Sequence, residues 1–286
     1  MTSQNLRILG INAHPHDFTH YAGTLGIHSS MGDEVTIVSV TSGASTHNEK
    51  LRDELRKPPE ERDQDLINES TDKYAAQKKA EFLGAASLFG ISDVRMLSYP
   101  DKPFNIERYP EAIEELRDIL LEIRPHLMIT QSPFTTGRHG MAFSLRDDHT
   151  EVANASLEAM QRAAIPRPGD DRPQHRIASV MYPGVYFDRS QIDFVVEISE
   201  DWYEKRVEAE AMYESQGHTV AYARRRIGTT VGHTGLGART PYGEAFVRHA
   251  PELVSHITIP EPVLQLAEDP TRHRKAVEEQ AARSAE

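Results

Sequence analysis

The apolar run Leu6-Arg7-Ile8-Leu9-Gly10-Ile11, followed directly by Asn12-Ala13-His14-Pro15-His16-Asp17, decides the predicted fold. The first six residues form a short hydrophobic segment, which predicts a buried strand. The next six contain imidazole and carboxylate side chains in a turn that a proline stiffens. In α/β sheets ligands bind beyond the carboxyl ends of the strands, so this turn is a candidate functional site.

The turn carries side chains that zinc prefers. Histidine and aspartate bind Zn²⁺, and a proline between two histidines presents both from a fixed arch. We therefore interpret His14 and Asp17 as metal ligands and His16 as a residue directed toward the substrate. Most histidine-rich turns bind no metal, so this interpretation requires a third ligand elsewhere in the chain.

Strand-like and helix-like patterns alternate outward from this turn. This order predicts one α/β domain with a Rossmann-like, mostly parallel sheet and helices on both faces. The domain is expected over residues 1–260, with residues 261–286 as a charged tail or peripheral helix. Strands are predicted at 34–40, 94–97, 126–130, 178–187 and 194–198, and helices at 19–30, 72–89, 111–124, 152–164 and 202–215.

Composition limits the classes of protein. The 286 residues include 38% hydrophobic and 27% charged side chains, which is typical of a globular domain. A formal net charge of −12 argues against a nucleic-acid partner. The absence of cysteine excludes disulfides, a thiol nucleophile and cysteine-ligated zinc. Neither a signal peptide nor a membrane span is recognisable, so we expect a cytoplasmic protein without a membrane partner.

Asp147-Asp148-His149 is the best candidate for completing the metal site. The segment lies where a predicted strand and loop lead into a helix, so His149 is expected at the same sheet edge as His14. Two histidines and one carboxylate leave a position for water on zinc. Asp148 with Glu151 also fits a helix cap with a capping box, and both roles are compatible. The polar segment 41–71 is expected to be a long loop over this edge.

At this point the sequence resembles the PIG-L/LmbE-like zinc deacetylases. Their members carry an Ala-His-Pro-Asp-Asp-Glu turn after the first strand, a Gly-Gly-Thr-Leu-like element and a later His-Pro-Asp-His. Here these segments read Ala13-His14-Pro15-His16-Asp17-Phe18, Ala22-Gly23-Thr24-Leu25 and Arg146-Asp147-Asp148-His149. Further matches are Lys78-Lys79-Ala80-Glu81, Tyr99-Pro100-Asp101, Ser215-Gln216 and Tyr242-Gly243-Glu244-Ala245-Phe246. The resemblance extends from about Leu6 to Arg248.

The resemblance implies a role for each matching position. The family's three zinc ligands match His14, Asp17 and His149, its catalytic Asp preceding the third ligand matches Asp148, and its substrate-binding residues match Lys78 and Asp101. It also implies Zn²⁺ or a similar divalent metal as cofactor, a small sugar derivative as substrate and a homo-oligomeric assembly. The expected reaction is hydrolysis of an N-acyl group, most simply N-acetyl.

Two catalytic positions depart from the family pattern. His16 stands where the family has its Asp general base, and Arg146 where it has the His that stabilises the oxyanion. An imidazole titrates near pH 6.5 and can accept a proton at neutral pH, and a guanidinium can stabilise an oxyanion. The swaps are therefore compatible with a deacetylase. They are also compatible with a metal-dependent lyase or isomerase in which His16 abstracts a proton, or with a metal-holding protein without turnover.

Other polar residues are less informative. His20 is more typical of a surface or packing residue than of a ligand, and Tyr213 replaces a family His, which indicates a pocket of altered polarity. Loop histidines that could reach the site are His139, His218 and His233. A basic segment is expected either as a solvated or subunit-facing patch or as a binding site for an anionic substrate group; it contains Arg224, Arg225, Arg226 and Arg239.

Overall fold

The computed structural model describes residues 5–134 and 147–269, together with a few isolated positions nearer the C-terminus. Within these residues a seven-stranded sheet forms the centre, in the order β3-β2-β1-β4-β5-β7-β6. Its strands are β1 (Arg7–Asn12), β2 (Glu34–Thr41), β3 (Asp93–Tyr99), β4 (Leu127–Thr130), β5 (Ser179–Pro183), β6 (Phe194–Glu197) and β7 (Gly243–Arg248).

The first five strands of the sheet run parallel, whereas β7 is antiparallel to both β5 and β6. This arrangement confirms the predicted mostly parallel α/β sheet. From β1 the chain continues to β2 and β3 on one side and then returns to place β4 on the other side of β1. The strand order thus reverses between β1 and β4, which is where open α/β sheets form their binding crevice.

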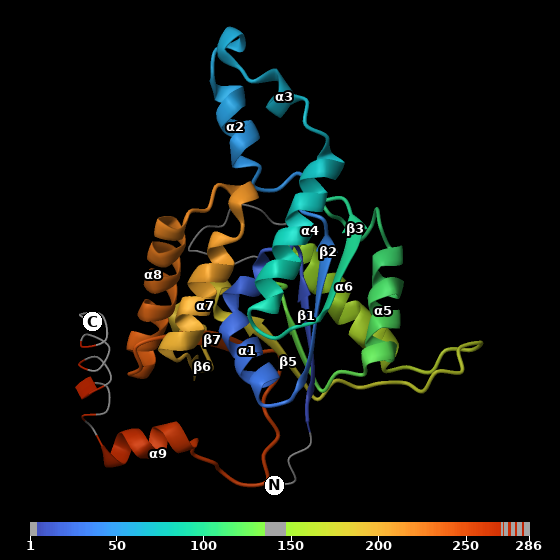
Figure 1. Ribbon diagram of the computed structural model, residues 1–286. Coiled ribbons are helices and arrows are strands. Elements are labelled where there is room, and N and C mark those ends of the chain that lie inside the picture. The colour runs from blue at the N-terminus through green and yellow to red at the C-terminus, as the bar shows by residue number, and fades with distance from the viewer. Residues whose placement is uncertain are drawn as a thin grey trace.

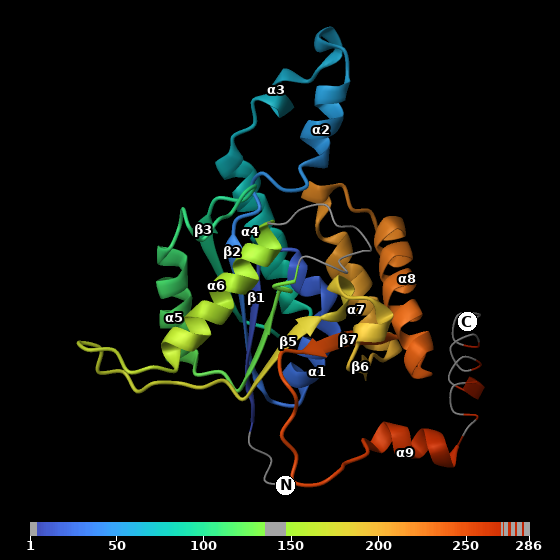
Figure 2. The ribbon, with the colours of Figure 1, turned by 180° about the vertical axis from the view of Figure 1, so that it is seen from behind.

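Helices cover both faces of the sheet, as Figures 1 and 2 show. One face carries α1 (Ala22–Ser30), α4 (Thr71–Ser87) and α7 (Glu200–Ala211), with α8 (Val220–Ala238) against α7 and β7. The other face carries α5 (Glu111–Ile123) and α6 (Asp148–Ala163). The remaining α-helices in the described ranges lie at the periphery and are α2 (Glu49–Arg56), α3 (Gln64–Ile67) and α9 (Glu261–Glu268).

Alternation along the strands produces two hydrophobic cores. Leu9 and Ile11 of β1 pack toward α5 and α6, whereas Ile8 packs toward α1, α4 and α7. Successive residues of a strand point to opposite faces, and a strand buried on both faces therefore reads as a continuous apolar run. The buried run at the start of the chain is this central strand.

Segment 41–71 differs from the expected structureless loop. It contains α2 and α3, which project beyond the carboxyl edge of the sheet (Figure 1). Asn48 caps α2 by accepting a hydrogen bond from the backbone N–H of Leu51, and Asp63 caps α3. Neither helix has a buried residue, so neither has the wide apolar stripe of a helix that packs on a core.

The predicted strand 178–187 is too long, because β5 ends at Pro183 and a 3₁₀ turn, Gly184–Tyr186, follows. The Gly-rich basic segment is largely helical, since it forms most of α8. Glycine lowers helix propensity, yet Gly235 is required by packing. A Cβ at this position would lie 2.5 Å from the carbonyl oxygen of Thr240. That glycine permits close packing of α8 on the chain leading into β7. None of the described helices is both long and apolar enough to span a membrane.

Candidate metal centre and adjoining cavity

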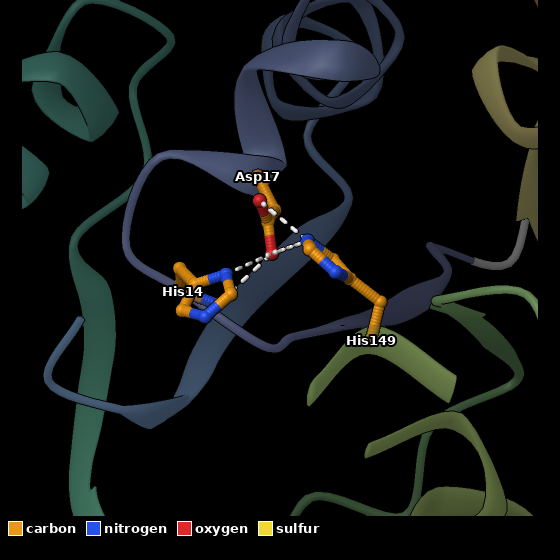
Figure 3. Close-up of side chains that lie close together, drawn as sticks. All are labelled: His14, Asp17 and His149. Carbon is orange, nitrogen blue, oxygen red and sulfur yellow. Dashed lines mark hydrogen bonds and ion pairs between the residues drawn. The ribbon is translucent and has the colours of Figure 1, made fainter. Parts of the chain in front are cut away.

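Three predicted ligands meet at the reversal point of the sheet. His14 and Asp17 come from the turn after β1, and His149 comes from the first turn of α6. Figure 3 shows the three side chains pointing toward one another. His14 Nδ1 lies 3.5 Å from Asp17 Oδ2, and His149 Nε2 lies 3.4 Å from both carboxylate oxygens of Asp17. One donor atom from each residue lies within 4.8 Å of the others.

The carboxylate of Asp148 contacts the ring nitrogen of His14 that faces away from Asp17. Its Oδ2 lies 2.9 Å from His14 Nε2, and the carboxylate also accepts hydrogen bonds from the backbone N–H groups of Lys102 and Phe104. A carboxylate on one ring nitrogen places the proton there and leaves the other nitrogen, Nδ1, as a lone-pair donor. Nδ1 is the nitrogen that faces Asp17.

The predicted capping role of Asp148 is wrong. Asp147 is the N-cap of α6, where its side chain accepts hydrogen bonds from the backbone N–H and the hydroxyl of Thr150. Glu151 accepts instead from the backbone N–H of Ile106, so the predicted capping box does not form. The cap therefore lies one residue earlier than predicted, and α6 begins at Asp148 instead of at position 152, so the Asp148 side chain is directed inward to His14.

Burial and close charges perturb the titration of this cluster. Burial alone would lower the pKa of His14, but its hydrogen bonds to Asp148 and Asp17 raise that pKa to about 9. Burial alone would raise the pKa of Asp17, but the two neighbouring imidazoles hold it well below its usual value. Without a metal, His14 is therefore protonated beside an ionised buried carboxylate, and a divalent cation would replace the proton on its Nδ1.

His16 points to a different partner. Its Nε2 lies 2.9 Å from Oε2 of Glu210, a fully buried residue of α7. The other carboxylate oxygen, Oε1, lies 3.3 Å from His218 Nδ1 and 3.3 Å from Arg226 Nε. The ring of Tyr213 packs edge-on against the ring of His16 at 4.8 Å between centroids. Glu210 therefore joins the base position to a cation on α8.

The charge state of Glu210 follows from these neighbours. Burial alone would raise the pKa of Glu210, but His16, Arg226 and His218 hold it well below the usual value. Burial lowers the pKa of His218 to about 4. At neutral pH the cluster therefore contains an ionised glutamate beside a neutral His218.

A cavity of about 430 Å³ opens beside both clusters. This volume lies in the range of small-molecule binding sites. Some residues of its walls were predicted from the sequence as site residues, and others were not. The lining residues are His16, Asp17, His20, His47, Glu49, His149, Tyr186, Gln216, Gly217, His218, Tyr222 and Arg226.

Lys78 and Asp101 lie outside this cavity lining. The amine of Lys78 donates to the backbone oxygen of Thr46, and Asp101 accepts from the Thr46 hydroxyl and the Ser45 N–H. Thr46 Oγ1 in turn lies 3.3 Å from His14 Nε2. Both residues thus brace the loop after β2 against His14. Their substrate-binding role stays a prediction.

Of the other predicted positions, only those within the described residues can be placed. Arg146 and His139 lie outside the described residues. His233 is exposed on α8 and does not line the cavity, whereas His218 does. His20, expected as a surface or packing residue, also lines the cavity.

Sequence reasoning missed Glu210. The only available signal was a charged residue three positions before Tyr213, on the helix that leads to Ser215-Gln216. Helix periodicity alone could not show which of the many glutamates of that segment is buried. Burial against His16 distinguishes Glu210 from its neighbours in the folded chain.

The chain also matches a known protein family. Residues 9–160 match the PIG-L family, described as GlcNAc-PI de-N-acetylase, and this match covers both halves of the His14, Asp17 and His149 cluster. The chain belongs to the PIG-L family. Family membership confirms the resemblance inferred from the ordered motifs of the sequence.

Two curated relatives of this PIG-L family member are named 1D-myo-inositol 2-acetamido-2-deoxy-alpha-D-glucopyranoside deacetylase. The protein of Rhodococcus erythropolis is 28% identical over 190 residues, which are 59% of this chain and 59% of that relative. The protein of Streptomyces griseus is 27% identical over 185 residues, which are 62% of this chain and 54% of that relative. The matches thus span less than two thirds of both relatives.

Solved structures share the PIG-L fold of this chain. The N,N'-diacetylchitobiose deacetylase of Pyrococcus horikoshii aligns with a TM-score of 0.68 at 22% identity, covering 90% of this chain and 88% of that chain. The 4-carboxy-2-hydroxymuconate hydratase of Pseudomonas putida aligns with a TM-score of 0.68 at 17% identity, covering 88% and 99%. The same fold therefore occurs in proteins named for two different reactions.

Proposed function

We propose that this PIG-L family member is a zinc-dependent hydrolase that removes an N-acyl group, most simply N-acetyl, from a sugar derivative. The observation that carries the proposal is the convergence of His14, Asp17 and His149 beside a cavity, with Asp148 behind His14. Two imidazoles and one carboxylate form a catalytic zinc site that leaves a position open. The deacetylase names of the curated relatives support the same reaction.

The donor set fits the metal that the proposal requires. His14 Nδ1, the Asp17 carboxylate and His149 Nε2 would hold the ion, and Asp148 would keep the proton of His14 on Nε2. Bound zinc would lower the pKa of water toward 7 and polarise the acyl carbonyl.

In this proposal His16 is the general base that receives the proton of the attacking water. Its Nε2 is held by Glu210, so Nδ1 is the nitrogen that takes the proton and later returns it to the leaving amine. Glu210 orients the ring and stabilises the imidazolium that forms, as a buried carboxylate does in other histidine-based sites. Arg146 is assigned to the oxyanion by its position in the sequence alone.

The substitution at position 16 also favours a second candidate, a metal-dependent lyase. A carboxylate-oriented imidazole can abstract a proton from carbon as well as from water. The hydratase of Pseudomonas putida has the same TM-score as the Pyrococcus horikoshii deacetylase. In a lyase, His16 would take the carbon-bound proton, and water would add or leave without acyl transfer.

Metal analysis and product analysis test the proposal together. We expect one zinc per wild-type chain and acetate release from N-acetylated sugars. His149→Ala should lose both, whereas the exposed control His233→Ala should keep both. His16→Ala should keep zinc but lose turnover. A zinc-free wild type, or full activity in either His149→Ala or His16→Ala, would contradict the proposal.

The His16→Asp variant separates the two reactions. It restores the carboxylate that the family resemblance implies at the base position, so a hydrolase should retain measurable acetate release. A lyase that depends on imidazole should lose activity with the same change. Mass spectrometry of the products decides between them, because hydrolysis releases acetate, whereas lyase action adds or removes water.

A further inference from the structure

Arg226 is a cation fixed at the wall of the cavity. Its Nε lies 3.3 Å from Oε1 of the buried Glu210, and its Nη1 lies 3.2 Å from the hydroxyl oxygen of Tyr222. About a third of the Arg226 side chain, 32%, is exposed, whereas the Glu210 side chain is 0% exposed. This ion pair is therefore oriented, with its negative end inside the protein and its positive end toward the cavity.

The neighbouring cluster could in principle favour a second metal ion. Donor atoms of His16, Glu210 and His218 lie within 4.8 Å of one another, which is close enough for a shared cation. The Glu210 carboxylate, however, already lies against the guanidinium of Arg226, and that fixed positive charge repels a divalent cation. The negative charge of Glu210 is thus already balanced by Arg226. The guanidinium, which faces the cavity, favours an anion.

The geometry of Arg226 suits recognition of oxygen anions. A guanidinium presents several N–H donors in one plane, and carboxylate or phosphate oxygens accept two of them at once. The ion pair with Glu210 and the hydrogen bond from Nη1 to the Tyr222 hydroxyl restrict the guanidinium, so binding an anion costs less side-chain entropy than at a free arginine. Glu49, an acidic residue that also lines the cavity, lies 2.7 Å from Arg52 and is already paired.

We propose that Arg226 binds an anionic group of the substrate, a carboxylate or a phosphate, in the cavity beside the candidate metal centre. This inference takes from the proposed function only the identity of the bond that reacts; binding of the anion itself does not depend on it. It narrows the substrate class from sugar derivatives to acidic ones. Tyr222, which shares the cavity wall, would position the guanidinium through its hydroxyl.

Three related sugars serve as probes for this site. N-Acetylglucosamine is neutral, its 6-phosphate carries a phosphate, and N-acetylmuramic acid carries a carboxylate. Calorimetric binding to the zinc-loaded protein should favour at least one acidic sugar over the neutral one by about tenfold or more, the scale of a charge-assisted hydrogen bond. Which acidic sugar is favoured distinguishes the two anion chemistries.

Variants of Arg226 test the assignment. Arg226→Gln should reduce the ratio of acidic-sugar to neutral-sugar affinity, measured in the same variant, from about tenfold to about one. Arg226→Lys keeps a charge beside Glu210 and should retain only part of the preference, because lysine lacks the planar fork. Arg225→Gln, a change at the exposed neighbouring arginine, should behave as wild type. Circular dichroism and thermal unfolding check that each variant is folded.

The outcomes separate this inference from the proposed function. If no sugar releases acetate but acidic sugars still bind in an Arg226-dependent manner, the hydrolase proposal fails and the anion site stands. Equal binding of neutral and acidic sugars by the wild type overturns the anion site. An unchanged preference in folded Arg226→Gln also overturns it, as does a second bound zinc that requires His218.

Discussion

The carboxylate of Asp148 lies 2.9 Å from Nε2 of His14, on the opposite ring nitrogen from the one that faces Asp17. Asp148 thus stands where the outer carboxylate of a carboxylate–histidine–metal arrangement stands, the position from which such a carboxylate fixes the tautomer and the orientation of the ring. It also explains why two adjacent aspartates, Asp147 and Asp148, have unlike roles. One caps α6, and the other supports the candidate metal centre.

Asp148→Asn should weaken zinc binding about 10- to 100-fold, because the amide does not keep the charge that holds the His14 proton on Nε2. Competition with a chromophoric chelator measures the affinity. Asp93→Asn serves as a matched control, since Asp93 pairs with Arg95 at the edge strand and not with a predicted ligand. Equal zinc affinity in the Asp148 variant and the wild type would refute the supporting role.

Asp147→Ala should lower the free energy of unfolding by about 1 kcal/mol, because the first turn of α6 loses its cap. Asp147→Ser should recover most of that loss, since a serine hydroxyl can accept the same N–H. Chemical denaturation of the metal-free proteins measures both changes. If serine is as destabilising as alanine, the aspartate acts through its charge and not as a cap.

Stability should depend on pH through Glu210. The pKa of Glu210 is held well below its usual value in the folded protein, whereas an unfolded glutamate titrates near 4.3. As the pH falls below about 4.5, the unfolded chain therefore takes up the proton first, and the free energy of unfolding decreases. Each unit by which the pKa is lowered contributes about 1.4 kcal/mol.

Glu210→Gln should remove the part of the pH dependence of stability that comes from Glu210. The variant should be less stable than the wild type at neutral pH, because Arg226 loses its buried partner. The difference should shrink as the pH is lowered toward about 3. Denaturation curves across this range measure it, with the exposed Glu208→Gln as control. A difference that stays constant with pH would show that Glu210 is not ionised in the folded state.

Two glycines of α8, Gly232 and Gly235, should respond in opposite directions to substitution by alanine. No heavy atom outside its own helix backbone and chain neighbours lies within 4 Å of a Cβ on Gly232, so Gly232→Ala should raise stability by roughly 0.5–1 kcal/mol. A Cβ on Gly235 would lie 2.5 Å from a backbone oxygen, so Gly235→Ala should destabilise by about 1–3 kcal/mol. Thermal unfolding distinguishes the two, and a gain in both variants would contradict the close packing of α8.

Local pattern determined much of the fold. The apolar run before His14 predicted β1, because a strand buried on both faces must be apolar throughout. Helical spacing predicted α5, whose apolar residues all face the same core. The peripheral α2 and the glycine-rich α8 were not predicted as helices. α2 has no buried residue, and the buried side chains of α8 form only a narrow stripe of Ala223, Ile227 and Val231 among glycines and arginines.

The candidate site also contains some residues that the sequence predicted and others that only the structure identified. Side-chain chemistry and strand ends were enough to nominate His14, Asp17 and His149 from the sequence, because the ends of parallel strands converge at one sheet edge. Only the tertiary structure paired Asp148 with His14 and buried Glu210 between His16 and Arg226. Those pairs join residues more than a hundred positions apart, or helices whose rotation depends on core packing. Which carboxylate faces an imidazole is therefore decided by how the helices pack on the sheet.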